Sequence, residues 1–143
     1  MQSGEIVSLS KQHVIGGPSD FMEEMTLIKD IGIEGNVFQG GEKQVCVFFA
    51  EARQWMDEQT TRGLCFERFS ENILLKGLPL GILKPGDVLS FGDAKLQISG
   101  GKPCFDECER YSNHLPCRLS KNAFFAVVLS DGSIKLGDKV FLT

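Results

Sequence analysis

The sequence predicts a mostly β fold in which short strands form a barrel or a sandwich. Sixteen glycines, many of them beside Asn or Asp, divide the 143 residues into short segments. Few of these segments are long enough for a helix, whereas several are apolar runs of strand length. Three Gly-Asp pairs also precede apolar segments, as turns between strands do, namely Gly86-Asp87, Gly92-Asp93 and Gly137-Asp138.

Apolar runs and alternation predict strands along most of the chain. Val45–Phe49 and Phe124–Leu129 are continuous apolar runs, which are typical of strands buried on both faces. Lys95–Ser99 alternates apolar and polar residues with a period of two, so it predicts a half-buried strand. Shorter predicted strands are Ile6–Leu9, Met25–Ile31, Val88-Leu89 and Val140–Leu142.

One segment, Ala50–Gln59, predicts a helix. Phe49, Ala52 and Met56 follow one another at spacings of three and four, which puts them on one helical face. We expect the polar run Thr60–Gly63 to end this helix. We also expect the eleven phenylalanines to fill the core of the fold.

Length and composition favour one domain that spans residues 1–143. A hydrophobic share of 42% argues against a disordered chain, and a net charge of −4 argues against nucleic acid as a partner. No apolar run approaches the ~20 residues of a membrane-spanning helix. The first residues, Met1–Glu5, lack the basic and apolar stretches of a signal peptide. We therefore expect a cytoplasmic protein with no membrane partner.

Five cysteines, an odd number, do not favour a disulfide-bonded secreted scaffold. Cys46 lies within the apolar run Val45–Phe49 and is expected to be a small core residue. Three others form the pattern C-x3-C-x8-C at Cys104, Cys108 and Cys117.

Three interpretations of this pattern are open. In the first, Cys104 is a reactive thiolate and Cys108 is a neighbouring thiol able to resolve a bond formed at Cys104. A helical turn would put both residues on one face. Lys102 and the helix N-terminus would favour the thiolate form of Cys104. In the second, Cys104, Cys108 and Cys117 bind zinc or an iron–sulfur cluster, with His114 as a fourth ligand. In the third, all three are ordinary half-buried cysteines. Gly100 and Gly101 would let a bulky partner approach.

Two polar segments are further candidates. Arg68 could hold a phosphate while Glu71 and Asn72 line a site, because a guanidinium donates two hydrogen bonds to phosphate. Alternatively, Asn72 and Glu71 tie down a turn. Gly40–Gln44 could form an anion-binding nest of backbone N–H groups, or simply the loop that leads into Val45.

Four stretches in order resemble one protein family. They are Gly32–Val45, Arg68–Leu83, Ile82–Leu96, and the long stretch Gly101–Asp138 with Cys104, Cys108 and Cys117. Together they resemble the MOSC domain, named for the C-terminal region of molybdenum cofactor sulfurase, and most of all its small stand-alone bacterial members. The resemblance implies a β-barrel-rich fold with a few short helices. It also implies that Cys104 carries sulfur or contacts a molybdenum cofactor.

The chain departs from the family pattern at three points. Asn36-Val37-Phe38 stands where the family usually has Asp-x-His, Phe105 stands where stand-alone members commonly have His, and Lys43 replaces an Arg. These changes weaken a case for acid–base or metal chemistry and leave the thiol intact.

The resulting hypothesis is a sulfur carrier of the sulfurtransferase type. Cys104 would take a sulfane sulfur from a cysteine desulfurase or another donor, form a persulfide, and deliver it to a molybdenum or tungsten enzyme or a cofactor-assembly protein. Cys108 would assist release. In a close variant the protein binds the molybdenum cofactor (molybdopterin) itself, through Cys104 and the candidate residues Lys43, Arg68, Asn72 and Lys102. The rival hypothesis is a non-catalytic zinc or iron–sulfur module held by Cys104, Cys108 and Cys117.

Overall fold

The computed structural model describes residues 2–59, 69–102 and 117–143. The strands are β1 (Gln2–Lys11), β2 (Asp20–Met22), β3 (Glu24–Ile28), β4 (Gly32–Ile33), β5 (Val45–Phe49), β6 (Ile73–Lys76), β7 (Val88–Phe91), β8 (Ala94–Gly101), β9 (Phe124–Ser130), β10 (Gly132–Lys135) and β11 (Lys139–Leu142). The helices are α1 (Ala50–Asp57) and α3 (Arg118–Asn122). The predicted mostly β class is therefore confirmed.

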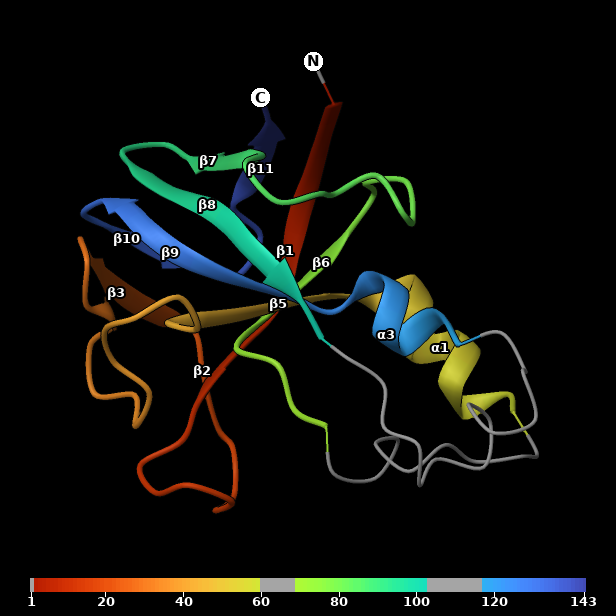
Figure 1. Cartoon of the computed structure of the whole chain (residues 1–143), viewed down its shortest axis with the longest axis horizontal. Helices are drawn as coiled ribbons and strands as arrows, with labels where there is room; N and C mark the ends of the chain where they lie inside the picture. Colours follow the sequence, from red (N-terminus) through yellow and green to blue (C-terminus); the bar gives the residue numbers. More distant parts are fainter. Residues whose placement is uncertain (1, 60–68, 103–116) are drawn as a thin grey trace.

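Seven strands close into a barrel (Figure 1). They follow the order β11-β7-β8-β9-β5-β6-β1, and the pairing of β1 with β11 completes the ring. Neighbours in the ring are antiparallel except β5 and β6, which are parallel. β2 extends the sheet beyond β1, and β10, β3 and β4 form a separate small sheet. The closed ring leaves its seven strands without a free edge, which is how a barrel protects its backbone.

The crossover from β5 to β6 contains α1, as a parallel pair requires a connection that leaves the sheet. The predicted helix is confirmed over Ala50–Asp57, and Ala52 and Met56 are buried as expected. The predicted stop at residues 60–63 lies outside the described residues. α1 and α3 pack together at one side of the barrel (Figure 1). Neither of these two described helices has the length or apolar character to cross a membrane.

Side chains from alternate positions fill the barrel. Val45, Val47 and Phe49 of β5 are fully buried, and so are Ala126 and Val128 of β9. This alternation follows from strand geometry, which points successive side chains to opposite faces of a sheet. Each fully buried large apolar side chain stabilises the fold by about 1.5–3 kcal/mol through the surface it removes from water.

The prediction that the phenylalanines fill the core is wrong for three of them. Phe21 is 73% exposed, Phe38 45% and Phe141 38%. These three exposed side chains do not contribute the hydrophobic stabilisation expected of a core residue. The buried phenylalanines among the described residues are Phe48, Phe49, Phe91 and Phe124.

Two of the predicted Gly-Asp turns have the same construction. In residues 84–87 and 135–138, the N–H of the Asp donates to the carbonyl three residues earlier, at 3.1 Å in both turns. Gly86 and Gly137 take φ values of 95° and 84°, which type II turns require at their third position. The carboxylates of Asp87 and Asp138 accept hydrogen bonds from the N–H groups of the first residues of the turns. The third pair, Gly92-Asp93, forms the two-residue loop between β7 and β8.

One predicted strand is shorter than expected. β3 ends at Ile28, whereas the apolar pattern extends to Ile31. The chain turns because Asp30 takes a φ of 62° and the N–H of Ile31 donates back to the carbonyl of Ile28 at 3.1 Å. Asp tolerates this left-handed conformation better than a β-branched residue does.

Candidate functional site

Three neighbouring strands carry a row of residues on the outer surface of the barrel. Cys46 of β5 pairs with Phe125 of β9, and Phe125 pairs with Gly100 of β8. Cys46 and Phe125 are partly exposed, while the residues before and after each of them are buried. A Cβ added at Gly100 would meet no atom of the described residues within 4 Å, so none of them fills the space over this end of the row. We call Cys46, Phe125 and Gly100 the outer row.

Lys43 lies against the outer row. Its Nζ is 5.1 Å from the centre of the Phe125 ring, which is a cation–π distance. The next residue, Gln44, holds the loop in place, because its buried amide donates to the Gly41 carbonyl at 2.9 Å and accepts from the Val128 N–H at 3.0 Å. The structure thus places Lys43 beside the Phe125 ring. That it binds a cofactor stays a prediction.

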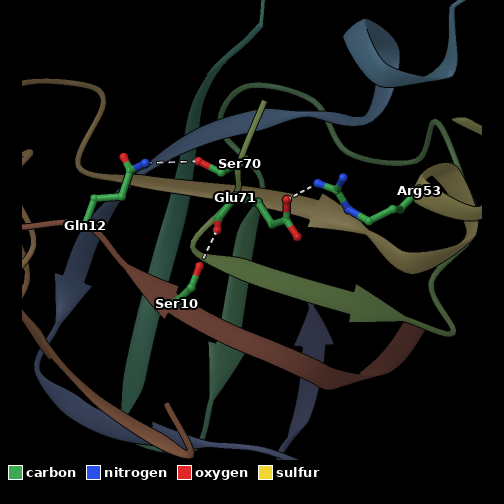
Figure 2. A network of polar contacts seen from close by, with 5 residues as sticks. All are labelled: Ser10, Gln12, Arg53, Ser70 and Glu71. Atoms are coloured by element: carbon green, nitrogen blue, oxygen red, sulfur yellow. Dashed lines mark hydrogen bonds and ion pairs between the residues drawn. The ribbon is translucent and has the colours of Figure 1, made fainter. Parts of the chain in front are cut away.

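An ion pair joins α1 to the segment that precedes β6. The guanidinium of Arg53 contacts the carboxylate of Glu71, as Figure 2 shows. The same guanidinium lies 5.2 Å from the centre of the Phe48 ring and 5.8 Å from that of Phe69. The two rings meet edge to face at 4.9 Å. Aromatic packing and a charge-assisted hydrogen bond therefore fix Arg53 and, through it, Glu71.

The Cys46 thiol is unsuited to nucleophilic chemistry. Burial of the thiol raises its pKa from 9.0 to about 12, and the nearby Glu71 carboxylate also raises this pKa, while Lys102 and Arg53 lower it. The thiol is therefore protonated at neutral pH, and only the thiolate is a nucleophile. The prediction that Cys46 is a small buried residue holds for its thiol, which is removed from water, although the residue as a whole keeps some exposed surface on the outer row.

Asn72 connects three strands at the start of β6. Its Oδ1 accepts the N–H of Cys46 at 2.9 Å, and its Nδ2 donates to the Ser10 carbonyl at 3.1 Å. Its backbone N–H and carbonyl bond the same two residues at 2.9 and 2.8 Å. These contacts support the interpretation in which Asn72 ties down a turn. The described residues leave one hydrogen of the Asn72 amide without a partner, and the cofactor-binding role stays a prediction.

The end of β1 holds the same segment from the other side. Ser10 Oγ donates to the Glu71 carbonyl at 2.7 Å, and Gln12 Nε2 lies 3.4 Å from Ser70 Oγ. Figure 2 shows these contacts together with the Arg53 ion pair. Gln12 Nε2 also donates to the Gly17 carbonyl at 2.8 Å. The loop between β1 and β2 is thereby linked to the segment beside Cys46.

The cysteine segment is described only at its two ends. The N–H of Lys102 donates to the carbonyl of Ala123 at 3.0 Å, so the chain leaves β8 beside the start of β9. Cys117, the residue before α3, is half-buried against the core. Four predicted site residues lie outside the described residues, namely Arg68, Cys104, Cys108 and His114.

Within residues 2–59, 69–102 and 117–143, no group of three or more His, Cys, Asp or Glu side chains could hold a metal ion. The predicted ligand set of Cys104, Cys108 and Cys117 includes two residues outside these ranges, so it stays a prediction. His13 is paired with Asp20 at 2.8 Å on the loop between β1 and β2. This pairing gives no support to a cysteine–histidine pair at the outer row.

Asn36 and Phe38, which replace the family's Asp and His, occupy different environments. Asn36 is buried and its Oδ1 accepts the N–H of Gln12 at 2.9 Å, while its Nδ2 has no hydrogen-bond partner in the described part of the chain. Phe38 is largely exposed. Asn36 therefore anchors the end of β1, and neither residue can act as an acid or base.

Comparison with known proteins supports one family. A sequence model of the MOSC domain matches residues 34–141, which is most of the chain. The chain belongs to the MOSC family. The predicted resemblance and the predicted β-barrel are thus both confirmed. A search of curated protein sequences finds no match.

Solved structures support the MOSC fold at low sequence identity. The YuaD protein from Bacillus subtilis is 15% identical, with a TM-score of 0.71 over 98% of this chain and 95% of that one. YiiM from Escherichia coli is 19% identical, with a TM-score of 0.65 over 100% and 70% of the two chains. YiiM from Geobacillus stearothermophilus is 22% identical, with a TM-score of 0.59 over 98% and 73%. These similarities establish the fold alone.

Sequence analysis missed two residues of this candidate site. Arg53 gives no local signal, because its partner Glu71 is 18 residues further along the chain. Phe125 looked like one more apolar residue of a buried strand. The pairing of Phe125 with Cys46 and its contact with Lys43 emerge only when the barrel closes.

Proposed function

We propose that this MOSC protein handles sulfur for a molybdenum- or tungsten-dependent enzyme or its cofactor, and that Cys104 is the working thiol at the outer row. The supporting observation is the position of Lys102. Its backbone is bonded at the start of β9, and its charge acts on the Cys46 thiol. Only Pro103 separates Lys102 from Cys104 in the sequence.

The contrast with Cys46 supports the choice of Cys104. A thiol with a pKa of about 12 contributes almost no thiolate at neutral pH. Cys104 follows a cation by two residues, and a neighbouring cation favours the thiolate form. Cys46 then serves as part of the surface on which the chemistry takes place.

The proposed transfer needs no external oxidant. The Cys104 thiolate attacks the terminal sulfur of a persulfide on a cysteine desulfurase or another donor, the donor's sulfur–sulfur bond breaks, and the donor leaves as a thiolate. Cys104 then carries the persulfide. Attack of the Cys108 thiolate on the inner sulfur of Cys104 would form a disulfide and release the sulfur as hydrosulfide to the acceptor.

The outer row also fits the close variant, in which the protein binds a molybdenum cofactor. The MOSC family is associated with this cofactor. Lys43 and Lys102 supply cations for a phosphate, the Phe125 ring supplies an apolar surface, and the space over Gly100 leaves room for a bulky group. Cys104 would be a soft ligand for the metal. When bound, the cofactor would supply the metal centre that accepts or carries the sulfur.

Intact masses under native and denaturing conditions test the proposal. Anaerobically purified protein is treated with a cysteine desulfurase and cysteine, and Cys104→Ala and Cys46→Ala are treated alongside. The carrier function predicts covalently added sulfur in the wild type and in Cys46→Ala, and none in Cys104→Ala. Addition that persists in Cys104→Ala would contradict it.

The same masses separate the carrier from its alternatives. A pterin or molybdenum mass that is present natively and lost on denaturation, without covalent sulfur, would favour the cofactor-binding variant. A count of reactive thiols with and without a chelator tests the metal module. Three thiols that react only after chelation would favour zinc or a cluster on Cys104, Cys108 and Cys117, whereas one fast thiol would favour the carrier.

A further inference from the structure

β2 is the edge strand of the large sheet. β1 pairs with β2 on one side, and no other described strand pairs with β2 on its far side. In Figure 1 the β1–β2 hairpin projects from the end of the barrel opposite to β7 and β11. An unpaired strand edge is a template for another strand, and a protein must either block it or use it.

The backbone of Phe21 faces this free edge. Phe21 lies opposite Ser10 in the β1–β2 ladder. The Ser10 N–H donates to the Asn72 carbonyl and its carbonyl accepts from Asn72 Nδ2, so both groups point away from β2. Residues opposite each other in an antiparallel ladder either exchange both hydrogen bonds or make neither. The N–H and carbonyl of Phe21 must therefore point outward, away from β1.

Large apolar side chains are exposed on the hairpin that carries this edge. The Phe21 side chain is 73% exposed, and Val14 and Ile15 in the preceding loop are 60% and 76% exposed. Gln12 and a turn between Val14 and Gly17 hold the loop in shape. Three large exposed apolar side chains on one hairpin favour an interaction surface there.

We propose that β2 pairs with β2 of a second copy of the chain, antiparallel, about a two-fold axis at Phe21. At such an axis Phe21 lies opposite Phe21 of the partner subunit. A residue on the axis can exchange both of its backbone hydrogen bonds with its own copy only if its N–H and carbonyl face outward, as those of Phe21 do. The two rings then lie on the same face of the joined sheets, where each covers the other.

Charge is compatible with this register. Asp20 lies opposite Met22 of the partner subunit, and Ser19 lies opposite Glu23 of the partner subunit, so no like charges face each other. The Asp20 carboxylate is already paired with His13 at 2.8 Å. Another occupant, such as an extended segment of a different protein, would need a sequence chosen for this edge, whereas the second copy is complementary by symmetry.

The joined edge is short, and the dimer is accordingly weak. Pro18 lacks an N–H, and the Glu23 carbonyl already accepts the N–H of Leu136 at 2.9 Å, so pairing is confined to the neighbourhood of Phe21. We expect a dissociation constant on the order of 10–100 µM, which is weaker binding than interfaces of standard size give.

Analytical ultracentrifugation from about 10 µM to 1 mM tests the proposal. The wild type is expected to shift from monomer to dimer over this range. Phe21→Glu places two carboxylates opposite each other and is expected to weaken the dimer more than about tenfold. Phe141→Glu, at an exposed phenylalanine on β11, is the matched control and is expected to dimerise like the wild type.

A second variant separates edge pairing from general apolar contact. Phe21→Pro and Phe21→Ala both remove the ring, and Phe21→Pro also removes an outward N–H, which an edge strand tolerates, so the β1–β2 ladder and the circular dichroism spectrum should be unchanged. Its dimer should be weaker than that of Phe21→Ala, which keeps the N–H. Equal affinities of Phe21→Pro and Phe21→Ala would overturn strand pairing. A wild type that stays monomeric at 1 mM, or a dimer that survives Phe21→Glu, would overturn the proposal and leave the edge to a strand of another protein.

Discussion

The inner and outer faces of β5 and β9 are made from alternating residues of the same two strands, yet the two faces differ in burial and in the residues that surround them. Inside, Val47 and Ala126 are completely buried among apolar neighbours. Outside, Cys46 and Phe125 remain partly exposed, and Lys43, Glu71 and Lys102 lie nearby. The difference teaches that a continuous apolar run conceals two environments. One face stabilises the barrel, and the other forms the half-exposed surface where we propose that the sulfur chemistry takes place.

Thiol labelling tests whether the Cys46 thiol on the outer face is removed from water, and it is the prediction with the largest expected effect. Cys46 should react with iodoacetamide at pH 8 about a thousandfold more slowly in the folded protein than in urea, because its pKa is raised from 9.0 to about 12 and only the thiolate reacts. Peptide mapping by mass spectrometry measures the rate at Cys46 alone. Equal rates in the two states would show that the thiol of the outer row is solvated and reactive.

Two adjacent phenylalanines compare the faces directly. Phe124→Ala removes a buried ring from the barrel and should lower the free energy of unfolding by about 3–5 kcal/mol. Phe125→Ala removes a partly exposed ring and should cost about 1 kcal/mol. Urea denaturation of both variants measures the difference. Equal losses would contradict the assignment of Phe125 to the outer row.

The Asn72 side chain joins Cys46 of β5 to Ser10 of β1, and its removal tests how much this bridge stabilises the ends of the strands. Asn72→Ala leaves the Cys46 N–H and the Ser10 carbonyl without their side-chain partner and should destabilise the protein by about 1–3 kcal/mol. Gln97→Ala is the matched control, because its amide makes only a long 3.5 Å contact with Gly86. A control as costly as Asn72→Ala in thermal melts would show that the bridge has no special role.

The smallest effect is a dependence on alkaline pH. Because the folded protein holds the Cys46 proton up to about pH 12 and the unfolded chain releases it near 9.0, stability should fall as pH rises above 9. The loss is at most about 1.4 kcal/mol per pH unit. Cys46→Ala lacks this group, so its unfolding free energy should fall less steeply between pH 9 and 10.5. Parallel curves for the two proteins would contradict the raised pKa.

Local patterns sufficed for two of the strands that carry the outer row. Val45–Phe49 and the start of β9 were predicted to the residue, because apolar runs of strand length are local signals. The expectation of burial on both faces holds for β5 at Phe48 and fails for β9, where Phe125, Val127 and Leu129 keep exposed surface. Which outer residues are covered depends on what packs against them from elsewhere in the chain.

The site was less predictable for the same reason. Lys43, Lys102 and Asn72 were singled out by local charge, local polarity and the family resemblance, and the structure places the two lysines and Asn72 around Cys46 and Phe125. Arg53 was missed, because its partners Phe48, Phe69 and Glu71 come together only through the crossover from β5 to β6. No spacing rule along the sequence encodes that contact.

The most direct test of the central claim is to locate the sulfur after loading. Wild-type protein treated with a cysteine desulfurase and cysteine is trapped with an alkylating agent and digested, and each cysteine peptide is examined for a persulfide. The account predicts the persulfide on Cys104, with Cys46 unmodified because its thiol stays protonated. A persulfide on Cys46, with Cys104 unmodified, would contradict both the choice of thiol and the role given to the outer row.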